Sequence, residues 1–330
     1  MIVAIDYISF QVDWLLLYSL KSDRLKRHER ILFMMERIKK IEKRALLIFA
    51  CLSFYYPALT MACPSGFLSQ EASYDQAFYN DDRWGKSDFV RIAETLEAIY
   101  EPIVWQETGF DLVIYKSWAS ETVNAFAKQD GDKINISLHG AVLRHPWVTL
   151  DAFTLLVCHE IGHILGGQPM LAGTSWAASE GQSDYFATNK CLKRLWAIDG
   201  SMSSWEIPPD LDFYVDSCRD RYNSSDDRKV CVRSLMAGAS IASLYWDVAN
   251  QNEPFPEVPL KDPTIVKYTQ LMHPSSQCRL DTYKAGAWCR KDFNDPFSNY
   301  DSKMGACLRD NGDLLGARPQ CWYRARIPKS

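Results

Sequence analysis

Residues 159–163 of the 330-residue chain read His-Glu-Ile-Gly-His and lie inside an apolar stretch. The two histidines and the glutamate have the spacing of a metal site. In a helix, His159 and His163 lie one turn apart on the same face, so both imidazoles can reach a single ion. Zinc acidifies a bound water, and Glu160 would take the proton of that water as it attacks a carbonyl. The alternative is a helix with two hydrogen-bonded histidines and a surface glutamate. We favour a zinc-dependent hydrolytic centre.

A third ligand is expected in the next helical segment, because a catalytic site with two histidines needs one more ligand and an open position. Residues 180–184 read Glu-Gly-Gln-Ser-Asp, which places Glu180 and Asp184 one turn apart. Glu180 would complete the ligand set. Asp184 would accept the free ring N–H of His159 or His163 and so orient that ring. A solvated acidic face is the alternative, but the flanking residues are apolar, and buried carboxylates need partners.

These motifs resemble a known family. HExxH followed by ExxxD is the gluzincin pattern of zinc endopeptidases, and residues 123–127, Val-Asn-Ala-Phe-Ala, resemble the NAFA strand of the HtpX and CAAX-prenyl-protease family. His273-Pro274, followed by Arg279, is similar to the His-Pro…Arg element of that family. The resemblance covers about Asp88 to Arg279.

The resemblance implies roles for further residues. Asn124, Ala125, Phe126 and Ala127 would form the sheet edge against which a substrate is laid, and His273 and Arg279 would stabilise the tetrahedral intermediate. The chain departs from the family in a short interval between His163 and Glu180, and in lacking the multiple transmembrane helices of HtpX and the prenyl proteases. It looks like an exported relative, for which a prenyl-protein substrate is not expected.

Composition and periodicity predict an α+β fold. The chain is 47% hydrophobic and 24% charged, as globular proteins are, and its net charge of −4 gives no reason to expect nucleic-acid binding. Apolar periodicity predicts helices and three short strands. The resemblance implies that zincin-type active-site helices pack on that small sheet. The expected helices are 88–104, 149–165, 175–198 and 228–248, and the expected strands are 111–118, 123–128 and 133–138. The chain from Gln251 onward is expected to be irregular and held by disulfides.

The N-terminal part reads as a targeting segment. Residues 35–62 combine a basic stretch, an apolar stretch from Ala45 to about Leu59 and a small-x-small site at 60–62, as a signal peptide does. The domain prediction is therefore a doubtful extension over 1–34, a signal peptide over 35–62, a metallopeptidase core over 63–200, and a C-terminal part over 201–330. That last part would complete the core with the His-Pro element and add a disulfide-rich tail. An uncleaved membrane anchor is the alternative to the signal peptide.

Ten cysteines are many for a reducing compartment and fit an exported chain, periplasmic or secreted. Near neighbours in sequence suggest three local bridges, Cys218 with Cys231, Cys278 with Cys289 and Cys307 with Cys321. Helical offsets bring Cys158 and Cys191 close to the contact between the two metal-bearing helices, where they either pair or remain buried thiols. Removal of the signal peptide would remove Cys51, so Cys63 is left over, directly after the expected cleavage point, where it would carry a lipid anchor in a bacterial lipoprotein.

The sequence thus predicts a zinc-dependent endopeptidase with one Zn²⁺ per chain and a polypeptide substrate among envelope or extracellular proteins. One alternative is a catalytically inactive relative that serves as a binding or scaffold protein in the envelope. The complete HExxH and ExxxD set argues against it. A non-proteolytic zinc hydrolase is the other alternative.

Overall fold

The structure is a computed structural model that describes residues 66–68, 72–73, 83–200, 202, 204–249 and 251–325. The expected N-terminal extension, the signal peptide and Cys63 lie outside the described residues. From Thr60 onward the chain forms one compact unit. Among the residues described, no helix has both the length and the apolar character needed to cross a membrane.

A three-stranded sheet forms one layer of this unit. Its strands are β2 (Asp111–Ser117), β4 (Ala125–Asp130) and β5 (Lys133–His139), in the order β2-β5-β4. β5 runs parallel to β2 and antiparallel to β4, and Gly131, at φ +63°, forms the tight turn between β4 and β5. Alternate residues of β5 are buried, as the two-residue period predicts. β4 is an edge strand, directly preceded by β3 (Thr122–Val123), which pairs with the short β1 (Ala72–Ser73).

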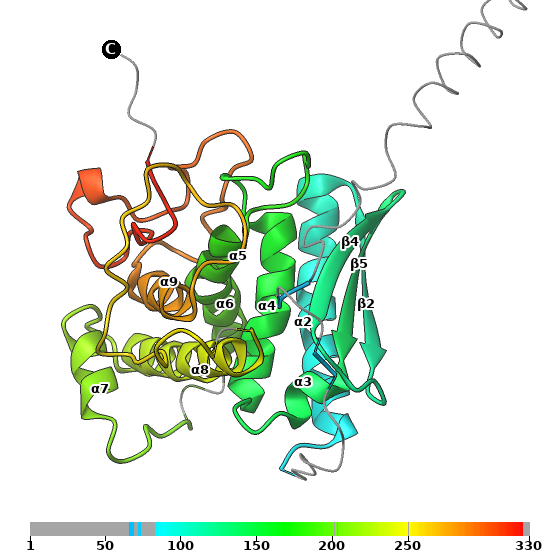
Figure 1. Cartoon of the computed structure of the whole chain (residues 1–330), viewed down its shortest axis with the longest axis horizontal. Coiled ribbons are helices and arrows are strands. Elements are labelled where there is room, and N and C mark those ends of the chain that lie inside the picture. Colours follow the sequence, from blue (N-terminus) through cyan, green and yellow to red (C-terminus); the bar gives the residue numbers. More distant parts are fainter. Residues whose placement is uncertain are drawn as a thin grey trace, which may run out of the picture. The chain divides into compact units, whose positions relative to one another are not determined.

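Helices cover the sheet and build the core. α2 (Lys86–Thr108) packs on β2, while α4 (Leu150–Leu165) contacts α2, β4, α5 and α8 and so lies at the centre of the fold (Figure 1). α3 (Gly140–Arg144) joins the sheet to α4. The helix expected over 175–198 begins later and is divided: α5 (Glu180–Phe186) passes through a π-helical turn at Ala187–Cys191 into α6 (Leu192–Asp199). The expected α+β class is confirmed.

The C-terminal half is more helical than expected. α7 (Asp212–Arg219) and α8 (Ser225–Ala249) are followed by α9 (Ser276–Trp288), in the region expected to be irregular. That expectation was wrong for α9 because the helix is buried on nearly every side, from Ser276 to Ala287, and therefore lacks a polar face. A single 3₁₀ turn, Arg309–Asn311, is the remaining helical element of the described tail.

The described residues hold four disulfides, whose Cα–Cα distances are 5.6–5.9 Å. The predicted Cys158–Cys191 and Cys218–Cys231 bridges are present. The other two expected pairings are wrong, because the bridges are Cys278–Cys321 and Cys289–Cys307. Cys278 and Cys289 lie at opposite ends of α9, where a rise of 1.5 Å per residue separates them by roughly 16 Å, too far for a bond. Four disulfides indicate an oxidising, exported environment.

The cysteine-bridged tail packs against α5. The Trp322 ring covers Gly181 so closely that a Cβ there would lie 2.3 Å from it. The Tyr185 hydroxyl donates to the Gly316 carbonyl at 2.6 Å, and Arg318 donates to the Gln182 side chain at 2.6 Å. The tail therefore supports the helix on which Glu180 and Asp184 lie.

Candidate metal centre

α4 brings the two histidines and Glu160 into the core. Thr149 caps the helix by accepting a hydrogen bond from the Ala152 amide at 3.1 Å, and the apolar run behind it is buried on all sides. His159, Glu160 and His163 have no exposed surface. A buried polar cluster at this depth needs partners, and these come from the next helix.

α5 crosses α4 at close range. A Cβ at Gly162 would lie 2.9 Å from both Cα and the carbonyl oxygen of Ser183, so the two backbones touch at this point. The Ala178 amide, in the loop between the helices, donates to the His163 carbonyl at 2.7 Å. Glu180 is the first residue of α5, where the helix dipole favours a negative charge.

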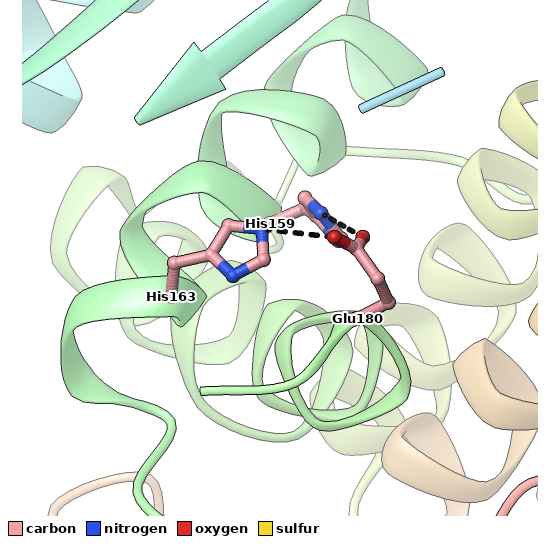
Figure 2. Close-up of side chains that lie close together, drawn as sticks. All are labelled: His159, His163 and Glu180. Atoms are coloured by element: carbon pink, nitrogen blue, oxygen red, sulfur yellow. Dashed lines mark ion pairs between the residues drawn. The ribbon is translucent and has the colours of Figure 1, made fainter. Parts of the chain in front are cut away.

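The crossing aims the Glu180 carboxylate at both imidazoles (Figure 2). His159 Nε2 lies 3.4 Å from Glu180 Oε2, and His163 Nε2 lies 3.8 Å from Glu180 Oε1. One ligand atom from each residue lies within 4.8 Å of the others. The His159–His163–Glu180 set could therefore hold a metal ion.

The other ring nitrogens are held by the protein. Nδ1 of His159 lies 2.7 Å from Asp184 Oδ1, one of the two pairings predicted for Asp184. Nδ1 of His163 lies 2.8 Å from the Ala178 carbonyl oxygen and 3.0 Å from Ser183 Oγ. When Nδ1 donates to these oxygens, the lone pair of each Nε2 is directed at the shared site, as metal-binding histidines require.

The charges around the centre favour a cation. Burial alone would lower the pKa of His159, but Asp184 and Glu180 raise it to about 9. Burial also opposes ionisation of Glu180, yet His273 and His163 hold the pKa of this carboxyl below its usual range. A negative pocket with two imidazole nitrogens and a carboxylate oxygen is a donor set that fits a divalent metal ion.

Glu160 differs from the other buried acids of the centre. Neither of its carboxylate oxygens makes a hydrogen bond of ordinary length among the described residues, although the Ala127 backbone lies close enough to lower its pKa. Burial raises the pKa of Glu160 to about 7, against the opposing charge of His159. An uncommitted carboxyl with a pKa near neutrality, beside a metal ligand, is what a general base requires.

His273 lies at the centre as well. The Glu180 amide donates to the Leu271 carbonyl at 3.1 Å, which brings the segment before α9 to the start of α5. His273 Nε2 is 3.3 Å from Glu180 Oε2 and 3.0 Å from the Gly66 carbonyl oxygen, to which it donates. Its ring stacks on Tyr245, with the ring centroids 6.0 Å apart.

Arg279 is fully buried and faces Asp184. Its Nε and Nη2 donate to the two Asp184 oxygens at 2.9 and 2.8 Å, and its Nη1 donates to the Phe67 carbonyl at 3.0 Å. Tyr283, one turn later on α9, donates its hydroxyl to Asp184 Oδ1 at 2.7 Å. Burial would raise the pKa of Asp184, but Arg279 and His159 lower it to about 2.

The predicted substrate edge lies beside α4. Ala125, Phe126 and Ala127 open β4 and pair with β5, and α4 contacts β4 directly. Asn124 precedes them, almost fully buried, with its side-chain oxygen accepting from the Leu68 amide at 3.0 Å. The structure therefore brings the predicted metal ligands, Glu160, Asp184, His273 and Arg279 together around α4, α5 and α9, with β4 beside α4. The Phe126 ring lies instead on the other face of β4, 5.8 Å from the His139 ring.

Sequence reasoning missed three residues of this neighbourhood: Tyr283, Gly66 and Phe67. Tyr283 follows Arg279 by four residues, a signal that is readable only once α9 is known to be a helix. No protein-family model matches the chain, and no curated protein and no solved structure is found to match it.

Proposed function

We propose that this chain is a zinc-dependent endopeptidase, exported from the cytoplasm and related to the HtpX and CAAX-prenyl-protease family. The observation that carries the proposal is the convergence of His159 Nε2, His163 Nε2 and the Glu180 carboxylate beside the uncommitted carboxylate of Glu160. Glu160 is fully buried beside this ligand set, where desolvation costs free energy unless a water or a metal ion offsets it.

Zinc suits this ligand set because His₂Glu leaves one position open for a substrate or water. When bound, zinc would polarise the substrate carbonyl and make water a stronger nucleophile near neutral pH. His159, His163 and Glu180 would hold the ion. Asp184 would keep the His159 ring oriented through its 2.7 Å contact with Nδ1.

Glu160 would serve as general base and then as general acid. It would take a proton from the attacking water and deliver it to the leaving amine as the peptide bond breaks. Its pKa of about 7 suits both transfers, because a group that titrates near the working pH can accept and release a proton.

His273 would stabilise the developing oxyanion by donating from Nε2, which already donates to a carbonyl oxygen in this structure. Arg279 would act as a positioning residue through Asp184, because two of its nitrogens are engaged with that carboxylate. The β4 edge at Asn124–Ala127 would pair with an extended substrate backbone, as peptide-binding sheet edges do.

The proposal is tested by digestion of an unfolded casein-type substrate with the mature chain. We expect cleavage that is abolished by a chelator and restored by zinc. The Glu160→Gln variant should retain zinc but not cleave, while the matched change Glu94→Gln, at an exposed position of α2, should leave cleavage intact. A folded, zinc-loaded wild-type chain that cleaves no peptide bond would contradict the proposal. Product analysis would then separate a scaffold protein from a non-proteolytic hydrolase.

A further inference from the structure

The metal centre is closed in this structure. His159, Glu160, His163 and Glu180 have no exposed surface, although a polypeptide must reach them in an endopeptidase. A segment far upstream in the sequence, Gly66–Leu68, lies against the centre. The Phe67 ring meets the His159 ring edge-on, with the centroids 5.0 Å apart, and the Gly66 carbonyl accepts from His273.

The segment lies along the sheet edge on which a substrate is expected. The Phe67 amide donates to the Ala125 carbonyl at 2.7 Å, and the Leu68 amide donates to the Asn124 side chain at 3.0 Å. A few residues later, β1 pairs antiparallel with β3, directly before β4. The described residues on either side, Gly66–Leu68 and Ala72–Ser73, therefore both pair with this edge, as an added strand does.

Two side chains of the expected reaction site bind carbonyls of this segment. His273 Nε2 donates to Gly66 O at 3.0 Å, and Arg279 Nη1 donates to Phe67 O at 3.0 Å. Two successive carbonyls are thus held by the two residues of the His-Pro…Arg element.

The Phe67 side chain fills an enclosed pocket. It has no exposed surface, and the Arg279 guanidinium carbon lies 4.1 Å from the ring centroid, a cation–π contact. The Tyr245 ring meets it at 6.4 Å and the His159 ring at 5.0 Å. The pocket walls are therefore suited to a flat aromatic side chain.

Gly66 fits where other residues would not. Its φ is +80°, and a Cβ there would lie 2.7 Å from the Ala125 carbonyl oxygen and from the Asn124 side chain. Any side chain at this position would push the segment off the edge. The glycine therefore sets how closely an extended chain can approach β4 beside the metal centre.

We propose that Gly66–Leu68 occupies the substrate groove of the metal centre, and that the groove selects an extended chain in which a glycine is followed by an aromatic residue. The segment competes with substrate, so the chain limits its own activity until the segment is displaced. This inference rests on the proposed endopeptidase function for the nature of the incoming chain. The groove and its occupant depend only on the contacts of Gly66–Leu68 with β4, His273 and Arg279.

The test measures binding of a fluorescently labelled peptide with the sequence of residues 64–73 to the full chain by anisotropy. Glu160→Gln is present throughout, so that nothing is cleaved. Gly66→Ala should displace the internal segment and bind the peptide at least about tenfold more tightly than the parent chain, because the groove is then open. Gly312→Ala is the matched control, since Gly312 has φ +82° and no atom within 4 Å of its Cβ position, and it should bind as the parent does.

Equal affinity of the Gly66→Ala chain and the parent would overturn the inference. A peptide with alanines at the positions of Gly66 and Phe67 should bind at least about tenfold more weakly to the Gly66→Ala chain, and equal binding would overturn the selectivity. If Gly66→Ala does not fold, as judged by thermal unfolding, Phe67→Ala decides the question by the same readout.

A cleavage assay tests this inference and the proposed function separately. With Glu160 restored, Gly66→Ala should raise kcat/KM on an unfolded substrate by at least about tenfold, as expected when a competing segment is removed. Peptide binding without cleavage in any variant would retain the groove and reject the endopeptidase. Cleavage at the parent rate by a folded Gly66→Ala chain would retain the endopeptidase and reject the competing segment.

Discussion

Arg279 on α9 and Asp184 on α5 form a fully buried, two-point ion pair, with nitrogen–oxygen distances of 2.9 and 2.8 Å. The same Asp184 carboxylate holds Nδ1 of His159 at 2.7 Å. A residue of the C-terminal half therefore helps to fix the orientation of a candidate metal ligand, His159, in the N-terminal half without contacting His159 itself.

Arg279→Lys should lower zinc affinity by about 10- to 100-fold, because lysine keeps the charge but cannot make the two-point contact that orients Asp184. Competition with a chromophoric chelator measures this. Arg221→Lys is the control, since Arg221 pairs with Asp313 at 2.8 Å and donates to the Trp288 carbonyl at the C-terminal end of α9, away from Asp184. Unchanged zinc affinity in a folded Arg279→Lys chain would show that Asp184 is positioned by other groups.

The zinc content of two variants distinguishes a metal ligand, Glu180, from a general base, Glu160. The mature chain should bind about one zinc, as a His₂Glu site requires. Glu180→Ala should lose most of it, whereas Glu160→Gln should keep it and lose activity. Elemental analysis of the purified variants measures both, and full zinc occupancy in Glu180→Ala would reject Glu180 as a ligand.

His273→Ala should lower kcat on the order of a hundredfold with zinc retained, since it removes a donor to the oxyanion. His273→Gln keeps an N–H donor and should recover part of the loss. Steady-state kinetics on an unfolded substrate provide the measurement. A kcat equal to that of the wild type in His273→Ala would mean that the His-Pro match has no catalytic meaning here.

The Cys158–Cys191 bridge joins α4, beside His159, to the π turn that follows α5. Replacing both cysteines with serine should weaken zinc binding and lower the free energy of unfolding by about 3–4 kcal/mol. The matched control replaces Cys218 and Cys231 with serine. Their bridge closes a shorter loop away from α5, so its removal should lower the free energy of unfolding by about 3 kcal/mol and leave zinc affinity unchanged. Equal zinc affinities of the two double variants would show that the bridge does not clamp the centre.

Acid should destabilise the chain through His145. Burial lowers the pKa of His145 to about 4, against the attraction of Asp247, from the 6.5 of an exposed histidine. Between these pH values the unfolded chain binds a proton that the folded chain excludes, so stability falls as pH drops from 6.5 toward 4. At pH 5 the free energy of unfolding should be lower by about 2 kcal/mol than well above pH 6.5, where the histidine is neutral in both states.

Denaturant unfolding of the zinc-free chain at pH 7 and pH 5 checks this. The His145→Asn variant lacks the titrating group and should show a smaller difference between the two pH values. Wild type and variant with the same pH dependence would contradict the role of His145.

Two elements of the centre were predictable because their residues repeat with the period of a helix. His159 and His163, like Glu180 and Asp184, are four residues apart in long apolar segments with helical periodicity, and in a helix this spacing places both side chains on one face, one turn apart. The α9 helix gave no such signal, because Arg279, Asp281 and Lys284 are buried in it beside apolar residues. Without α9, Cys278 and Cys289 looked like neighbours, and their bridge was predicted wrongly.

The Gly66–Leu68 segment lay beyond prediction for a different reason. Its contacts with Asn124 and Ala125 span more than fifty residues of sequence, and those with His273 and Arg279 span more than two hundred. Three residues carry no periodicity, so nothing in their pattern specifies a partner. Only the packed structure shows where such a segment lies.

The backbone contact between Gly162 and Ser183 has a consequence for how this protein can vary. Because the two helices meet main chain to main chain at Gly162 and Ser183, with the Phe186 ring beside them, their closest approach is set mainly by the backbone. Substitutions elsewhere in the interior can accumulate and be accommodated while this separation stays constant. Position 162 itself is the exception, since even one added methyl group would drive the two helices apart and divide the ligand set.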